Sequence, residues 1–173
     1  PMVAADLPAL APEAQERFRR FLFGEKGWFD GSARECWRPA RASGRLVGGC
    51  LSVLTTTLGT PYELATEGRV LFLEDVAESP YRIDRMLTQL AHAGKFEQVA
   101  AVVFGAMLDR DGGEDGGELR EIALEALAGT RCPIIYGVDA GHGSNNVVLP
   151  MGCEVSVDAE ARVMELCEPA FAE

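Results

Sequence analysis

Short apolar runs alternate with amphipathic stretches along the middle of this chain. Residues 69–76 (RVLFLEDV) have the β-prone, nearly continuous apolar composition of a buried strand. Residues 80–94 follow with apolar positions at helical spacing, and this predicted helix begins at Pro80 and stops at Gly94. Because residues 98–105 (QVAAVVFG) then return to the strand pattern, the sequence predicts a βαβ unit with two parallel strands.

The second half of the chain adds one more buried strand and then changes its pattern. After an acidic, glycine-rich loop at 109–117, we expect a helix over 118–128 and a strand over 133–138. Three buried strands separated by helices predict an α/β fold with a parallel core sheet. Residues 146–168 consist of short alternating runs joined by turns, which are typical of an antiparallel meander or a second sheet.

The first 45 residues have a weaker pattern. Residues 8–23 carry apolar side chains at helical spacing and predict one amphipathic helix. Residues 24–45 are rich in Gly, Arg and Trp without a clear period, so we expect a connector that includes one edge strand around residues 36–39. From Gly44 onward the alternation of strands and helices begins.

Composition narrows the classes of function. The 16 Lys and Arg against 27 Asp and Glu give a net charge of −11, so a nucleic-acid partner is not expected. The 47% of hydrophobic residues can build a core, but no apolar run approaches the roughly 18 residues of a membrane span, so no membrane partner is expected. The 5 cysteines form no CxxC pair, which favours reduced thiols in the cytoplasm, and we expect neither a metal nor a cofactor.

Glu74 is the first candidate for chemistry. It ends the apolar run of residues 69–74, at the carboxyl end of a predicted buried strand, where α/β sheets collect catalytic groups. A glutamate that simply faces solvent at a strand end is the plainer alternative. Asp75 should point to the opposite side of the strand, so the two carboxylates are not expected to form a dyad.

His142 is the second candidate, because it follows the strand predicted at 133–138 and so should lie at the same edge of the sheet as Glu74. Its neighbours Gly141 and Gly143 permit backbone angles that can aim an imidazole into a cleft. An exposed loop histidine is the alternative. His92 projects away from the apolar face of its predicted helix, so we expect it to be solvated.

A carboxylate that fixes the tautomer of an imidazole prepares that ring to take a proton from a serine or cysteine. None of the six serines lies in a Gly-x-Ser-x-Gly turn, and Ser144 is too close to His142 along the chain. Cys50 follows two glycines at a predicted helix start, although a buried structural cysteine is the stronger interpretation. The residues therefore indicate an orienting carboxylate and a base without a nucleophile.

Four stretches of the chain carry a resemblance to a known family: GRLVGGCLSVLTTTLGTP, LFLEDVAESPYRIDRMLTQLAHAGKF, VVFGAM and GHGSNNVVLPMG. Together they cover residues 44–152, and in this order they resemble the C-terminal part of the LD-carboxypeptidases. These serine peptidases include muramoyltetrapeptide carboxypeptidases and microcin C immunity peptidases. Residues 1–7 (PMVAADL) are similar to the family segment that follows the nucleophile-bearing domain, so we expect the chain to begin partway through the full enzyme.

The resemblance implies a two-domain enzyme whose N-terminal domain holds a serine in a Gly-Tyr-Ser-Asp type of turn. Glu74 and His142 fall on the glutamate and histidine that complete a Ser-Glu-His triad in this family. The C-terminal domain of the family is a layered β/β/α fold, expected here over residues 44–173, with residues 1–43 left from the domain junction. Cys50 departs from the asparagine that the family usually has in GGNL.

The function implied by the resemblance is cleavage of the terminal L-D amide of murein tetrapeptides during peptidoglycan recycling in the cytoplasm. The expected partners are the muropeptide, with Arg82 and Arg85 as candidate carboxylate binders, and the serine-bearing domain of the same enzyme. The isolated chain should then be inactive. Whether the enzyme forms a homodimer is left open by the sequence.

Two alternatives remain at this point. The first is an immunity-type peptidase that uses the same triad on a peptide-nucleotide, in which Trp28 or Trp37 could stack on the base. The second is a non-catalytic ligand-binding module, in which substitution of Glu74 or His142 would be tolerated.

Overall fold

The computed structural model describes residues 7–25, 28–108, 116–143, 146–167 and 170, and within them seven strands form one mixed sheet. The strands lie in the order β1, β5, β4, β3, β2, β6, β7. Their bounds are β1 Glu35–Arg38, β2 Arg41–Cys50, β3 Val70–Val76, β4 Ala101–Leu108, β5 Ile134–Tyr136, β6 Glu154–Asp158 and β7 Val163–Leu166.

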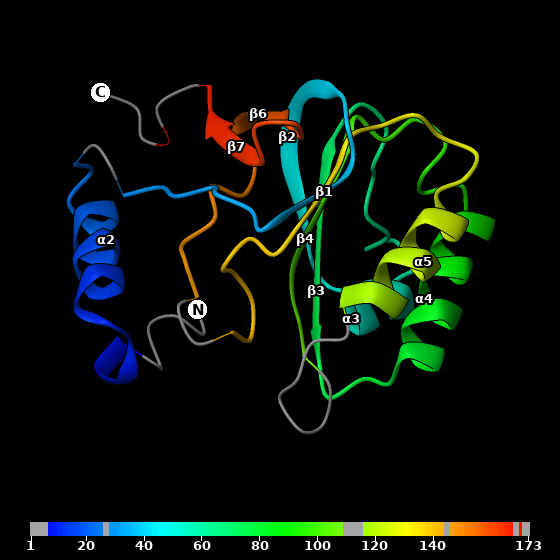
Figure 1. Ribbon diagram of the computed structural model, residues 1–173, viewed down its shortest axis with the longest axis horizontal. Helices are drawn as coiled ribbons and strands as arrows, with labels where there is room; N and C mark the ends of the chain where they lie inside the picture. The colour runs from blue at the N-terminus through cyan, green and yellow to red at the C-terminus, as the bar shows by residue number, and fades with distance from the viewer. Residues whose placement is uncertain (1–6, 26–27, 109–115, 144–145, 168–169, 171–173) are drawn as a thin grey trace.

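The helices lie on both sides of this sheet. Their bounds are the 3₁₀ helix η1 Leu7–Ala9 and the α-helices α2 Pro12–Leu22, α3 Leu51–Thr56, α4 Pro80–His92 and α5 Gly116–Ala126. Figure 1 shows α3, α4 and α5 together on one side of the sheet, with α2 apart on the opposite side. None of the helices in the described part of the chain is long and apolar enough to cross a membrane.

The parallel core expected from the sequence is confirmed. Strands β2, β3, β4 and β5 pair in parallel, and β3, β4 and β5 correspond to the three buried strands that were expected. Helix α4 links β3 to β4, and α5 precedes β5, as the alternating pattern predicted. The α/β class is therefore correct, and the carboxyl ends of the four parallel strands share one edge of the sheet.

The antiparallel strands continue the same sheet through β2. Residues 41–45 of β2 pair antiparallel with β6, while residues 46–50 pair parallel with β3. Strand β7 then pairs antiparallel with β6. The antiparallel layer expected from the tail is thus present, and β2 joins it to the parallel layer.

The core strands bury both faces, and alternate residues serve different layers. On β3, Leu71 and Leu73 pack in a cluster with α4 and α5, together with Val102 and Phe104 of β4. The intervening residues Val70, Phe72, Ala101 and Val103 pack on the other face with Val155 and Val157 of β6 and Met164 of β7. This two-sided burial explains why these strands read as continuous apolar runs.

Strand β2 was missed by the sequence pattern because glycines interrupt it. At Gly48 the backbone has φ +135°, and an added Cβ would lie 1.9 Å from the carbonyl oxygen of Phe72. Only glycine permits so close an approach of β2 to β3. A strand whose glycines serve close backbone packing therefore lacks the continuous apolar run that marks β3.

The N-terminal region is partly organised as expected. Ala14 and Phe18 of helix α2 form a small apolar cluster with Leu10, which precedes the helix. The edge strand expected around residues 36–39 is confirmed as β1, which pairs antiparallel with β5 at the edge of the sheet. Strand β2 begins at Arg41, so the boundary expected at residue 44 falls inside a strand, and that division stays a prediction.

Candidate active site

Glu74 lies next to an irregularity in the sheet. Leu73 of β3 pairs with Phe104 of β4, whereas the next ladder partner, Asp75, pairs with Met107. Strand β4 therefore carries an extra residue opposite Glu74, a bulge of the kind that re-aims a side chain at the end of a strand. The Glu74 side chain is 6% exposed, so the alternative that this glutamate simply faces solvent at the strand end is wrong.

The segment that follows β5 is hydrogen-bonded to β4 next to the bulge. The amide of Gly137 donates to the carbonyl of Phe104 at 2.9 Å, and the amide of Ala106 donates to the carbonyl of Ala140 at 3.1 Å. These bonds hold the chain after β5 against β4 and direct residues 140–143 toward Glu74. Side chains from β3 and from the loop after β5 thus meet at the carboxyl edge of the parallel strands.

Glu74 and His142 form a short hydrogen-bonded pair at this edge. The imidazole Nδ1 of His142 lies 2.7 Å from Oε2 of Glu74, and the backbone amide of His142 donates to the same oxygen at 3.2 Å. An ionised carboxylate only accepts hydrogen bonds, so a neutral imidazole in this contact carries its proton on Nδ1 and its lone pair on Nε2. The buried carboxylate therefore fixes both the backbone and the ring of His142.

The Nε2 atom of His142 is available for chemistry. It has no hydrogen-bond partner among the residues that the structure describes, and 31% of the His142 side chain is exposed. An imidazole with an oriented, accessible Nε2 can take a proton from a nucleophile and return it to a leaving group. The pair has the chemistry of an orienting acid and a general base.

Gly141 permits this contact. Its φ is +103°, and a Cβ built on it would lie 2.5 Å from Oε2 of Glu74 and 2.8 Å from Cγ. The close approach of the loop to the carboxylate therefore requires glycine at this position.

Asn146 was not among the residues expected at the site. Its side-chain Oδ1 accepts a hydrogen bond from the amide of Gly141 at 3.3 Å, and the residue is 8% exposed. The only signal in the sequence is an asparagine pair three and four residues after the glycine-flanked histidine, which periodicity does not identify.

Asp75 is buried but belongs to a separate group. Its carboxylate accepts from the amides of Ser52 at 2.7 Å and Val76 at 2.9 Å, and it is 3% exposed. Ser52 lies in the first turn of α3, so the carboxylate stabilises the start of that helix. The expectation that Glu74 and Asp75 form no dyad agrees with these separate partners.

We expect Asp75→Ala to lower the free energy of unfolding by about 2 kcal/mol, because it leaves the half-buried amide of Ser52 without its acceptor. Urea unfolding followed by circular dichroism measures this change. Asp75→Asn keeps an oxygen that can accept from Ser52 and should lose less than half as much. Equal stability of the alanine variant and the wild type would contradict this role.

The thiol of Cys50 contacts the start of α3. Its Sγ lies 3.1 Å from Oγ of Ser52 and 3.6 Å from Oδ1 of Asp75. All five cysteines are free, and burial raises the pKa of the Cys132 thiol, which opposes reactivity at that residue. Cys50 therefore belongs, with Ser52 and Asp75, to the group of side chains at the start of α3.

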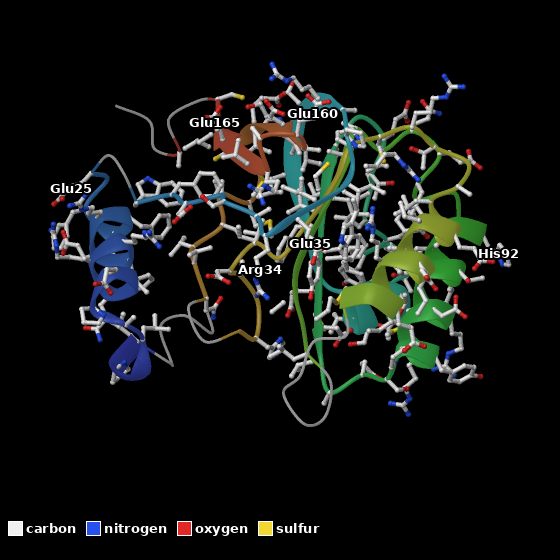
Figure 2. All side chains as sticks on the ribbon, viewed as in Figure 1. Glu25, Arg34, Glu35, His92, Glu160 and Glu165 are labelled. Carbon is white, nitrogen blue, oxygen red and sulfur yellow. The ribbon has the colours of Figure 1, made fainter. Side chains whose placement is uncertain are left out.

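The remaining charged candidates, His92, Arg82 and Arg85, lie on helix α4. Figure 2 shows His92 on the outer side of α4, away from the sheet, and it is exposed as expected. On the same helix, Arg82 pairs with Glu78 at 3.0 Å, and the Arg85 guanidinium lies 6.0 Å from the centre of the Tyr81 ring. Both arginines are exposed, and carboxylate binding by them stays a prediction.

The two tryptophans are buried. Trp37 is 4% exposed and stacks on Tyr136 with ring centres 4.5 Å apart, while Trp28 is 5% exposed and meets Phe21 edge to face. Neither presents a free ring face for a nucleobase. Ser144, discounted as a nucleophile, lies outside the described residues, and no group of three His, Cys, Asp or Glu that could hold a metal is found among those described.

Comparison with known proteins identifies the family. Residues 43–157, more than half of the chain, match the family described as LD-carboxypeptidase C-terminal domain. A Bacillus subtilis protein named "Probable murein peptide carboxypeptidase" is 37% identical over 125 residues, which cover 69% of this chain and 38% of that protein. The chain thus spans well under half the length of this relative.

Solved structures share the fold. The muramoyltetrapeptide carboxypeptidase of Oxalobacter formigenes superposes with a TM-score of 0.70 at 25% identity, covering 90% of this chain and 54% of that one. The structure of MccF in complex with glutamyl sulfamoyl guanosine superposes with a TM-score of 0.76 at 20% identity, covering 94% and 58%, and supports the fold alone. With the matched residues 43–157 containing the Glu74–His142 pair, the chain belongs to the LD-carboxypeptidase C-terminal domain family.

Proposed function

We propose that this chain supplies the orienting acid and the base of a Ser-Glu-His triad in an LD-carboxypeptidase. The observation that carries the proposal is the 2.7 Å contact between Nδ1 of His142 and the buried Oε2 of Glu74. The second contact, from the backbone amide of His142 to the same oxygen, holds the ring at a fixed place relative to the carboxylate. An oriented imidazole with a free Nε2 is the arrangement that a serine nucleophile requires.

In this mechanism the serine hydroxyl attacks the carbonyl carbon of the terminal L-D amide and passes its proton to Nε2 of His142. The imidazolium is stabilised by Glu74 and then protonates the amine of the departing D-residue, which leaves an acyl-enzyme ester. Water repeats the cycle: His142 removes its proton, the ester is hydrolysed and the serine recovers its hydrogen. Each half of the cycle therefore moves one proton onto Nε2 and off again, so one nitrogen serves all four proton transfers.

The serine comes from a part of the enzyme outside this chain. The thiol of Cys50 is hydrogen-bonded to Ser52 and Asp75, so we do not assign it the role of the nucleophile. The greater length of the relatives leaves room for a serine-bearing domain before residues 44–173, and that domain would also supply most of the oxyanion hole.

The substrate proposed is a murein tetrapeptide whose terminal D-residue is removed during peptidoglycan recycling. The names of the similar proteins, a murein peptide carboxypeptidase and a muramoyltetrapeptide carboxypeptidase, support this substrate class. The five free cysteines suit a reducing compartment, so the cytoplasm is the proposed location.

The second candidate is an immunity-type peptidase that cleaves a peptide-nucleotide amide. A sequence relative from Escherichia coli named "Microcin C7 self-immunity protein MccF", 27% identical over 129 residues, favours keeping this candidate. Against it, Trp28 and Trp37 are buried, so nucleobase stacking would need aromatic side chains other than these two.

A substrate panel on the full-length protein tests the proposal. We expect release of the terminal D-residue from a murein tetrapeptide, no cleavage of the matched peptide with an L-residue at that end, and slower cleavage of a peptidyl sulfamoyl nucleotide. A preference for the nucleotide substrate would favour the immunity-type function. Cleavage of neither substrate would reject both peptidase functions and leave the ligand-binding module.

A further inference from the structure

The loop that carries His142 is closed at its base by two hydrogen bonds. The amide of Val147 donates to the carbonyl of Asp139 at 2.6 Å. Inside this closure, the amide of Gly141 donates to the side-chain Oδ1 of Asn146 at 3.3 Å. Gly141 directly precedes His142, so the second bond restrains the backbone next to the histidine of the proposed catalytic pair.

We propose that Asn146 is a positioning residue for His142, acting through the amide of Gly141. The proposal deepens the proposed function and rests on it for its catalytic consequence. Among the described residues, the hydrogen bond found for the Asn146 side chain is to Gly141 and not to the imidazole. Its effect is to keep the backbone before His142 in the one conformation that points both the amide and Nδ1 of His142 at Oε2 of Glu74.

The backbone of Gly141 needs such a restraint. Its φ of +103° is one of many conformations open to glycine, and glycine has no side chain whose contacts could select it. Glu74 holds the loop from one side through His142. Asn146 holds it from the other side, so that the rotation of residue 141 is fixed between two side-chain oxygens.

Asn146 is itself built for this task. It is 8% exposed, so water competes weakly for its carbonyl oxygen. Its φ is +34°, in the left-handed region that asparagine tolerates better than most residues. A residue chosen only to close the turn could be glycine, whereas glycine would leave the amide of Gly141 without its acceptor.

Two substitutions separate these roles. Asn146→Gly tolerates the positive φ but removes the acceptor. Asn146→Asp also tolerates this φ and keeps an oxygen that accepts from Gly141. Comparison of these two variants therefore tests the hydrogen bond from Gly141 while the backbone conformation at residue 146 stays the same.

The first measurement is nuclear magnetic resonance on the 173-residue chain with ¹⁵N-labelled histidine. The chain has only 2 histidines, and His92 is exposed, so the two ring signals can be separated. At a pH at which the ring is neutral, the wild type should show the Nδ1-protonated tautomer at His142. Asn146→Gly should shift His142 toward a mixture of tautomers and speed exchange of the Gly141 amide about tenfold, while Asn146→Asp retains the wild-type pattern.

The second measurement is hydrolysis of murein tetrapeptide by the full-length enzyme. A neutral hydrogen bond contributes about 1 kcal/mol, so Asn146→Gly should lower kcat about five- to tenfold and leave KM within about twofold. Asn146→Asp should recover most of kcat. A merely structural role would lower thermal stability without moving the tautomer of His142.

The proposal is overturned if Asn146→Gly leaves both the tautomer of His142 and the exchange of Gly141 unchanged. It is equally overturned if Asn146→Asp behaves like Asn146→Gly in both measurements. The resonance experiment uses no substrate, so its result stands apart from the proposed function: absence of murein hydrolysis in the wild type would reject the function and leave the tautomer test intact.

Discussion

Replacement of His142 by alanine is expected to lower kcat of the full-length enzyme on murein tetrapeptide by about 10⁴-fold or more, with little change in KM. The imidazole is the group that moves the proton, so its loss removes both acylation and departure of the amine. The substitution should cost little stability, because 31% of the side chain is exposed and its one side-chain hydrogen bond within the described part of the chain is to Glu74. Steady-state kinetics and a thermal melt measure the two effects.

Glu74 provides the matched control for this prediction. Glu74→Gln should lower kcat about 10³- to 10⁴-fold, because an amide no longer selects the Nδ1-protonated ring. The double variant should be about as slow as His142→Ala alone, since the two residues act as one unit. Normal turnover by His142→Ala, or multiplication of the two losses in the double variant, would contradict the paired role.

The second large effect is expected at Gly141. In Gly141→Ala the new Cβ would lie 2.5 Å from Oε2 of Glu74 and 2.9 Å from its Cβ, so the whole glutamate side chain must shift. The φ of +103° adds backbone strain for any residue with a side chain. We expect a loss of about 2–4 kcal/mol in the free energy of unfolding and at least a 100-fold loss in kcat, measured by urea unfolding and steady-state kinetics.

Two other glycines separate strain from collision. Gly152 has φ +86° with nothing within 4 Å of an added Cβ, so Gly152→Ala tests strain alone and should lose about 1 kcal/mol with activity retained. At Gly143 the nearest atom to an added Cβ is Cβ of Ala106 at 3.3 Å, and alanine should be tolerated. If Gly141→Ala kept wild-type activity, the close approach to Glu74 would not be required for catalysis.

The parallel core could be predicted from the sequence because burial on both faces leaves a direct trace. Strand β3 and strand β4 are continuous apolar runs, and the helix between them begins at a proline, so pattern and structure agree to within a few residues. Strand β2 left no such trace. Its glycines serve close contact with β3, and close contact removes the side chains on which the pattern depends.

The joining of the two layers was also beyond the sequence pattern. Strand β2 pairs with β6 over its first half and with β3 over its second half, and this division depends on the register of residues that are distant in the chain. Alternation in β6 and β7 correctly predicted antiparallel strands. It carried no information about which strand they would join.

Part of the candidate site could likewise be predicted from local pattern, and part depends on contacts between distant segments. The positions of Glu74 and His142 after predicted strands placed them at one edge of the sheet, which local pattern can do. Their 2.7 Å contact depends on the bulge in β4 and on the loop bonds made by Ala106 and Gly141. These are contacts between distant segments, and for the same reason Asn146 escaped the sequence pattern.

The central claim is that Glu74 and His142 complete an active site whose serine lies in another domain. It is tested most directly by mixing the 173-residue chain with the separately produced serine-bearing domain and measuring release of the terminal D-residue from murein tetrapeptide. We predict no release by either part alone, release by the mixture, and none when the chain carries His142→Ala. Release by the 173-residue chain alone, or by the mixture with His142→Ala at the wild-type rate, would contradict the claim.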